Sequence, residues 1–244
     1  MEQQVSRRDR ARADTLRDIR AAARAVLVEH GVEGLALRAI AREVGLTAPA
    51  LYRYFASREE LVEQVVADLY GELVAVLEAE RDAVDAGSPG TRLLVTARAF
   101  RGWATTHRAE FGLLFGSAAE DVVPESPGGE GPAAAAGRRF GAVFAGLFAE
   151  IHLRRPIPVP ADDELDEDYR AQLLAWCAEL PVALPLGVMS LFLSCWVRLY
   201  GLVCMEVFGH LRFALDDAGP LFEAELWAMG EQLGIAGEWV PART

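Results

Sequence analysis

The sequence predicts an all-α protein made of a small N-terminal three-helix domain, which contains a helix-turn-helix, and a larger helical domain. Apolar residues recur at the spacing of amphipathic helices along the chain, and no segment alternates clearly as a strand would. Residues 1–58 carry eleven Arg against seven acidic residues, a local +4, although the whole chain has a net charge of −12. A basic N-terminal segment followed by an acidic remainder is typical of a DNA-contacting domain joined to a domain that does not bind DNA.

The N-terminal segment divides into an arm and a compact domain. Residues 1–12 are polar and hold four arginines, so we expect a flexible arm. A helix-turn-helix domain is predicted over residues 13–60 and a helical domain over residues 61–244. The first helix is expected from Asp14 to His30, and Gly31 ends it, as glycine commonly does. The face of this helix that should be buried is Ile19, Ala22, Ala23, Val26 and Leu27.

Two short helices follow, over residues 37–44 and 47–55, with Gly45 between them. Gly45 suits a turn that requires a positive φ. Thr47 is placed to cap the second of these helices, and Pro49 falls in its first turn, where a missing N–H costs little. This pattern predicts a helix-turn-helix, with an ordinary helical hairpin as the alternative.

The remaining chain reads as further helices separated by loops. Ser57 to Glu60 is a Ser-x-x-Glu capping box that opens a long fourth helix. The loops rich in Pro, Gly or acidic residues are 117–132 and 154–163. The helices expected after the capping box are 58–84, 91–107, 110–115, 133–153, 164–180, 186–209 and 220–233.

The composition argues against several classes of protein. Three cysteines without a Cys-x-x-Cys spacing do not indicate a disulfide framework or a zinc finger. The polar N-terminus shows no signal peptide, so we expect a cytoplasmic protein. Residues 182–209 are long and apolar, but Arg198 and Glu206 interrupt them, and no Arg-rich flank orients a span. A helix buried in a core or a subunit interface is the preferred interpretation, and no membrane partner is expected.

Residues 14–61 resemble the DNA-binding domain of the TetR family of bacterial transcriptional regulators. The matching text is AAARAVLVEHGVEGLALRAIAREVGLTAPALYRYFASREELV, with its Ala-x-x-Val-Gly turn and an aromatic pair before Phe55. The resemblance implies phosphate contacts by Thr47, Tyr52, Tyr54, Arg38 and Arg58, and contacts to bases or sugars by Ala48, Pro49, Ala50 and Arg53. Tyr54 stands where many members have His, and Arg58 where they usually have Lys. Alanines 48 and 50 offer few hydrogen bonds, so direct readout would rest on Arg53 and on apolar contacts to thymine methyl groups.

The C-terminal half resembles one subtype of the same family more loosely. The motifs are Phe111-Gly112-Leu113-Leu114-Phe115-Gly116, Trp196-x-x-x-Tyr200-Gly201 and Glu206-x-x-Gly209-His210-Leu211. The family resemblance implies a homodimer formed through the last two long helices, here about 186–209 and 220–233.

Large apolar and aromatic side chains are frequent in this half, where core packing and a ligand pocket are the two interpretations. The family resemblance favours a pocket for a small apolar or aromatic molecule, with His107 and Tyr200 as polar anchors. The residues expected to line it are Trp103, His107, Phe111, Phe115, Phe144, Phe148, Trp176, Met189, Phe192, Trp196 and Tyr200.

Together these expectations describe a ligand-responsive, sequence-specific DNA-binding regulator without cofactor or metal. The expected mode is repression, relieved when a small apolar molecule releases the protein from a palindromic double-stranded operator. A transcriptional activator of the same fold is the alternative. A membrane-associated helical protein and a helical enzyme are further alternatives, although the four histidines are scattered and no phosphate-binding glycine loop or nucleophile elbow is visible.

Overall fold

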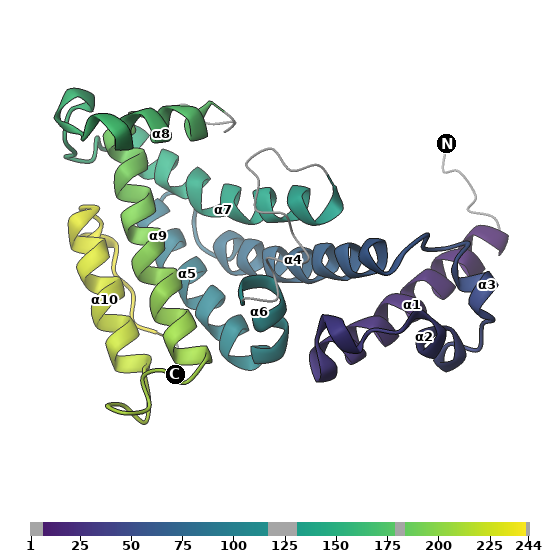
Figure 1. Cartoon of the computed structure of the whole chain (residues 1–244). Coiled ribbons are helices and arrows are strands. Elements are labelled where there is room, and N and C mark those ends of the chain that lie inside the picture. The colour runs from purple at the N-terminus through teal and green to yellow at the C-terminus, as the bar shows by residue number, and fades with distance from the viewer. Residues whose placement is uncertain (1–6, 117–130, 179–183, 243–244) are drawn as a thin grey trace. The chain divides into compact units, whose positions relative to one another are not determined.

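The computed structural model describes residues 7–116, 131–178 and 184–242 (Figure 1). These residues form ten α-helices and short 3-10 turns, with no strand among them. The chain divides into two compact units. The first unit contains residues 1–71 and 109–137, and the second contains residues 72–108 and 138–244. The all-α class predicted from the sequence is therefore confirmed.

Helix α1 (Arg7–His30) begins earlier than expected. Residues 7–12 are helical and not a flexible arm, so that expectation is wrong for them; residues 1–6 lie outside the described residues. Arginine and alanine favour helix, which lets α1 extend by more than a turn beyond its packed part. The predicted buried face is confirmed for Ile19, Ala22, Ala23 and Leu27. Gly31 follows at φ 68, and its N–H donates to the Leu27 carbonyl.

Helices α2 (Leu37–Glu43) and α3 (Ala48–Leu51) form the helix-turn-helix. Gly45 adopts φ 71, as the sequence predicts, and the Leu46 N–H donates to the Ala41 carbonyl at 2.7 Å. The second helix is shorter than the predicted 47–55. Tighter turn bonds replace the regular helix after Leu51, because the Arg53 N–H reaches Ala50 and the Tyr54 N–H reaches Leu51. A small aliphatic core holds α1, α2 and α3 together, made of Ile19, Ala23, Leu27, Ile40 and Leu51.

Helix α4 (Arg58–Asp82) starts at the predicted capping signal. The Ser57 hydroxyl accepts a hydrogen bond from the Glu60 N–H at 3.1 Å. The Glu60 carboxylate accepts from the N–H of Ala56 at 2.6 Å, one residue earlier than in a standard capping box. These bonds fix where the long helix begins relative to the turn after α3. Helix α6 (Arg108–Phe115) follows α5 in the chain, and its residues from 109 onward belong to the first unit.

The second unit contains the other long helices. Their bounds are α5 (Pro89–Thr106), α7 (Pro132–Arg154), of which residues from 138 onward belong here, α8 (Glu167–Cys177), α9 (Leu186–Val207) and α10 (Gly219–Gln232). The acidic helix predicted over 164–180 starts later, because Asp166 caps α8 by accepting from the Tyr169 N–H, and Asp162–Glu164 form a separate 3-10 turn. Residues 179–180 of that prediction lie outside the described residues.

An aromatic cluster fills the core of this unit. Phe100, which is fully buried, lies 5.6 Å from Phe140, 6.3 Å from Phe144 and 5.9 Å from Trp196, measured between ring centroids. Helices α5, α7 and α9 supply these rings, so the cluster joins three helices that are distant in sequence. Tilted and edge-on ring contacts of this kind add to the free energy gained by burial alone.

Helix α9 is the one helix among the described residues that is long and apolar enough to cross a membrane. It packs against α5, α8 and α10. Its two charged side chains form ion pairs within the protein, Arg198 with Glu225 at 2.7 Å and Glu206 with Arg101 at 2.7 Å. One face of α9 nevertheless stays exposed, with Val197 66% exposed, so the helix is not buried on all sides.

Candidate nucleic-acid interface and apolar cavity

The helix-turn-helix presents a polar and basic surface around α3. Tyr52 is 49% exposed although it is a large aromatic residue. Arg38 and Arg53 are also exposed, and neither has an ion-pair partner within the described part of the chain. Pro49 and Thr47 are exposed, while Ala48 and Ala50 are half-buried. Uncompensated guanidinium groups and exposed hydroxyl groups on one small domain are the groups that bind phosphate oxygens.

Thr47 has a structural task as well as a predicted phosphate contact. Its hydroxyl oxygen accepts from the Ala50 N–H at 3.3 Å and thereby caps α3. The hydroxyl hydrogen remains available to an outside acceptor, because capping uses only the oxygen lone pair. Thr47 is therefore able to serve both roles at once.

A notch lies between the start of α2 and the start of α4. Its volume is about 440 Å³, and its polar lining comes from Arg38, Tyr52, Ser57 and Arg58. Ser57 is not among the residues predicted for this surface, because its Ser-x-x-Glu context indicates only a helix cap. Two arginines and two hydroxyls around one open depression have the chemistry of an anion-binding surface.

Arg58 is partly engaged within the protein. Its guanidinium donates to the Val32 carbonyl at 3.3 Å and lies 3.6 Å from the Glu59 carboxylate. Tyr54, in contrast, is half-buried beneath a cation: the guanidinium carbon of Arg12 lies 5.2 Å from the Tyr54 ring centroid. The predicted arm residue Arg12 thus belongs to the same surface as the turn after α3.

The second unit contains an apolar cavity among α5, α7, α9 and α10. Its volume is about 40 Å³, far below the several hundred Å³ typical of a pocket for a drug-sized ligand. Four of the eleven predicted pocket residues line it, namely Phe144, Phe148, Phe192 and Trp196. The rest of the lining is mostly aliphatic, and no sequence signal distinguished it from ordinary core: Leu93, Leu94, Ala97, Cys195, Leu199, Leu226, Met229, Gly230, Leu233 and Ile235.

The other seven predicted pocket residues do not line this cavity. Trp103 and His107 stack on each other at 5.0 Å, with the His107 Nδ1 3.0 Å from the Trp103 carbonyl oxygen at the end of α5. Phe111 and Phe115 pack 4.8 Å apart in the first unit, where Phe115 also meets the ring of Tyr70. Two of the remaining three pack against rings that line the cavity, since Trp176 stacks on Phe192 and Tyr200 stacks on Trp196; the third, Met189, is buried.

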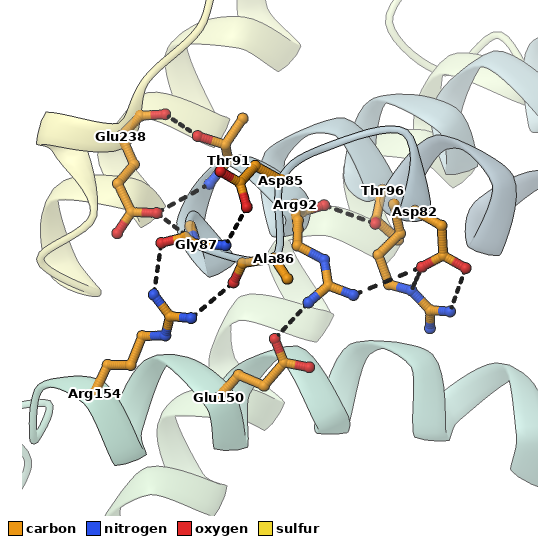
Figure 2. Close-up of polar contacts among 12 residues, drawn as sticks. Asp82, Asp85, Ala86, Gly87, Thr91, Arg92, Thr96, Glu150, Arg154 and Glu238 are labelled. Carbon is orange, nitrogen blue, oxygen red and sulfur yellow. Dashed lines mark hydrogen bonds and ion pairs between the residues drawn. The ribbon is translucent and has the colours of Figure 1, made fainter.

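The C-terminal segment closes one end of the cavity through Leu233 and Ile235. Glu238 anchors this segment on the start of α5 (Figure 2). Its carboxylate accepts from the Gly90 N–H at 2.8 Å, and its carbonyl accepts from the Thr91 hydroxyl at 2.7 Å. Ser88, the residue before α5, makes no side-chain cap, so Glu238 supplies the cap from the far end of the chain.

Arginine ion pairs hold α5 to the C-terminal helices. Arg101 makes two bonds of 2.7 Å to the Glu206 carboxylate, and these hydrogen bonds raise the pKa of Arg101 above its ordinary value. Arg98 pairs in the same two-pronged way with Glu223, at 2.9 and 2.7 Å. Both arginines also line a groove of about 660 Å³ beside α4 and the C-terminal segment. Because both are neutralised by carboxylates, the groove offers no free cation from them.

Helices α9 and α10 each expose apolar side chains. On α9, Val197 is 66% and Met205 40% exposed, Phe208 directly after the helix is 44% exposed, and a Cβ at Gly201 would meet open space. On α10, Trp227 is 38% exposed. Exposed apolar side chains gathered on two adjacent helices exceed the isolated examples usual on a monomer surface.

The comparisons with known proteins agree with this geometry. Residues 19–65 match the model "Bacterial regulatory proteins, tetR family", and residues 93–229 match "Tetracyclin repressor-like, C-terminal domain". The chain belongs to the TetR family. It is 33% identical over 210 residues to the HTH-type transcriptional regulators Rv1816 of Mycobacterium tuberculosis and Mb1846 of Mycobacterium bovis, which covers 82% of this chain and 83% of each relative.

Two solved structures share the fold of this chain. The regulatory protein SCO4313 superposes with a TM-score of 0.69 at 27% identity, over 92% of this chain and 98% of that one. A Rhodococcus sp. RHA1 protein of unknown function shares the fold, with a TM-score of 0.64 at 20% identity over 90% and 94% of the two chains. The protein is therefore a helix-turn-helix transcriptional regulator that binds DNA, and not an enzyme.

Proposed function

We propose that this TetR-family regulator is a cytoplasmic, homodimeric repressor that leaves a palindromic operator when a small apolar or aromatic molecule binds it. The observation that carries the DNA-binding part is the exposed surface around α3, where Arg38 and Arg53 are uncompensated and Tyr52 is exposed. Thr47, Tyr52, Tyr54, Arg38 and Arg58 would bind phosphates. Ala48, Pro49, Ala50 and Arg53 would face bases or sugars.

A homodimer is supported by the exposed apolar side chains of α9 and α10. One recognition helix buries too little surface for tight specific binding, whereas a dimer presents two, about one helical turn of DNA apart. Gly201 lies between Val197 and Met205 on α9 and has no side chain. A second copy of α9 would therefore be able to approach closely at this position. Sedimentation of the purified protein tests this: wild type should be dimeric, and Val197→Glu should be shifted towards monomer.

Ligand response is supported by the apolar cavity lined by Phe144, Phe148, Phe192 and Trp196. Because the cavity is only about 40 Å³, a ligand must enlarge it, so binding would be coupled to movement of the surrounding helices. Helix α4 has residues in both compact units and would carry such a movement towards the DNA-binding surface. Release from DNA requires the ligand to prefer the free form over the DNA-bound form.

The experiment that tests this function is selection of random duplex DNA by the purified protein at two salt concentrations. A palindrome whose half-sites lie about one helical turn apart, roughly 34–36 Å, would support a dimeric regulator. Weak, salt-sensitive binding without an enriched motif would contradict it. A reporter gene placed behind the selected operator then separates repression from activation.

A further inference from the structure

We propose that Arg8 and Arg12 on the first turns of α1 form a second phosphate-binding element, which contacts the DNA backbone beside α3. The proposal rests on the proposed DNA-binding function and adds to it a contact that the helix-turn-helix itself does not provide. Its experiment is chosen so that the two can fail separately.

The first turns of α1 bury no side chain. Residues 7–14 are all exposed, and the first buried residue of the helix is Ile19. Most helices in proteins gain their stability from an apolar face packed on the rest of the fold, which this segment lacks. Arginines in a first helical turn are moreover disfavoured by the helix macrodipole, and the one acidic residue there is Asp9. The arginines therefore do not serve the stability of α1.

Arg12 places this segment beside the turn that follows α3. Its guanidinium carbon lies 5.2 Å from the centroid of the Tyr54 ring, and Tyr54 follows α3 by three residues. A guanidinium stacked on a ring is held in orientation while its N–H groups stay available at the edge. Arg12 is thus oriented on the surface that carries Tyr52 and Arg53.

Helical geometry selects Arg8 as the partner of Arg12. At about 100° per residue, Arg8 lies roughly 40° from Arg12 around the helix and one turn further along it. Arg7 and Arg10 lie roughly 140° and 160° away, on the opposite side. Four arginines in one exposed segment therefore divide into two pairs of equal charge, of which only one is on the side of Tyr54.

This division provides a matched pair of variants. R8Q/R12Q and R7Q/R10Q remove the same charge from the same segment, and circular dichroism checks that α1 stays helical in both. The dissociation constant is measured for each protein between 50 and 200 mM salt, on the selected operator and on a random duplex. Each phosphate contact contributes about 0.9 to the slope of log Kobs against log salt.

We expect R8Q/R12Q to lower the magnitude of that slope by roughly 3.6, because the bound dimer loses two phosphate contacts in each protomer, and to weaken binding to operator and random duplex by the same factor. R7Q/R10Q should leave the slope close to that of wild type. Equal changes in the two variants, or no change in either, would overturn the inference while the wild type still selects its operator. A wild type that selects no sequence would overturn the proposed function and the inference together.

Discussion

In the helix-turn-helix, Tyr52 and Arg53 point to solvent, whereas in the second unit Phe100 is fully buried and Arg101 is held by a carboxylate. The core of the helix-turn-helix domain is mostly aliphatic, and Tyr52 is exposed at its surface. The second unit buries the ring of Phe100 and pairs Arg101 with Glu206 and Arg98 with Glu223. The same residue types are therefore exposed in one region and held by packing and ion pairs in the other.

The two regions differ in which arginines are available to bind a partner. A guanidinium held by two bonds to a glutamate has already satisfied its charge, so a ligand must compete with that glutamate. An exposed guanidinium without a carboxylate partner breaks no ion pair when it binds a phosphate. Substitutions in the second unit should accordingly change the free energy of unfolding, and substitutions around α3 should change DNA affinity.

The largest effect is expected from Phe100→Ala. The ring is fully buried among Phe140, Phe144 and Trp196, so its removal should lower the free energy of unfolding by about 3–5 kcal/mol. Urea unfolding at a fixed protein concentration measures this. Tyr52→Phe is the control and should change the free energy of unfolding by less than about 0.5 kcal/mol. A loss below about 1 kcal/mol for Phe100→Ala would show that the cluster can collapse around the gap.

Glu206→Gln should have the next largest effect on stability. It replaces two charged hydrogen bonds to the mostly buried Arg101 by one neutral acceptor and leaves only the more distant carboxylate of Asp217, at 3.9 Å, at a cost of about 2–3 kcal/mol. The control is Glu225→Gln, because Arg198 and Glu225 form a more exposed pair expected to contribute below about 1 kcal/mol. Equal losses in the free energy of unfolding for Glu206→Gln and Glu225→Gln would contradict the expectation that the more buried ion pair contributes more to stability.

Arg53→Ala should lower operator affinity without affecting unfolding. We expect a loss of about 1–3 kcal/mol in binding and a relaxed preference at one base pair of each half-site. Tyr52→Phe removes only a hydroxyl and should weaken binding to all sequences by a similar, smaller factor. Competition between operator and random duplex distinguishes the two. Unchanged affinity in both variants would mean that α3 does not face DNA.

The smallest effect concerns Cys195, which lines the apolar cavity. Burial raises the pKa of its thiol to about 11, from an ordinary value of 9.0. At pH 8 the native thiol should therefore resist iodoacetamide, while the unfolded chain reacts; mass spectrometry of the labelled peptides measures this. Because the unfolded chain releases this proton first, the contribution of Cys195 to stability should fall as pH rises from about 9 to 11. Rapid native labelling would indicate an open cavity.

The local structure of the helix-turn-helix domain could be predicted from the sequence alone. Gly31 ends α1 and Gly45 adopts a positive φ as predicted, Thr47 caps α3, and Ser57 with Glu60 starts α4. Such features depend on residues a few positions apart, so their spacing carries the information. The start of α1 was misjudged because exposed arginines and alanines are compatible with both an arm and a helix.

Only the tertiary structure decided which distant residues meet. Four of the eleven predicted pocket residues line the cavity, and Ile235 from the C-terminal segment joins them. Glu238 caps a helix that starts nearly 150 residues earlier, and Arg12 stacks on Tyr54. The sequence shows that a helix has an apolar face, but neighbouring helices decide which part of that face is core, cavity or open surface. That choice depends on the packing of side chains from several helices at once.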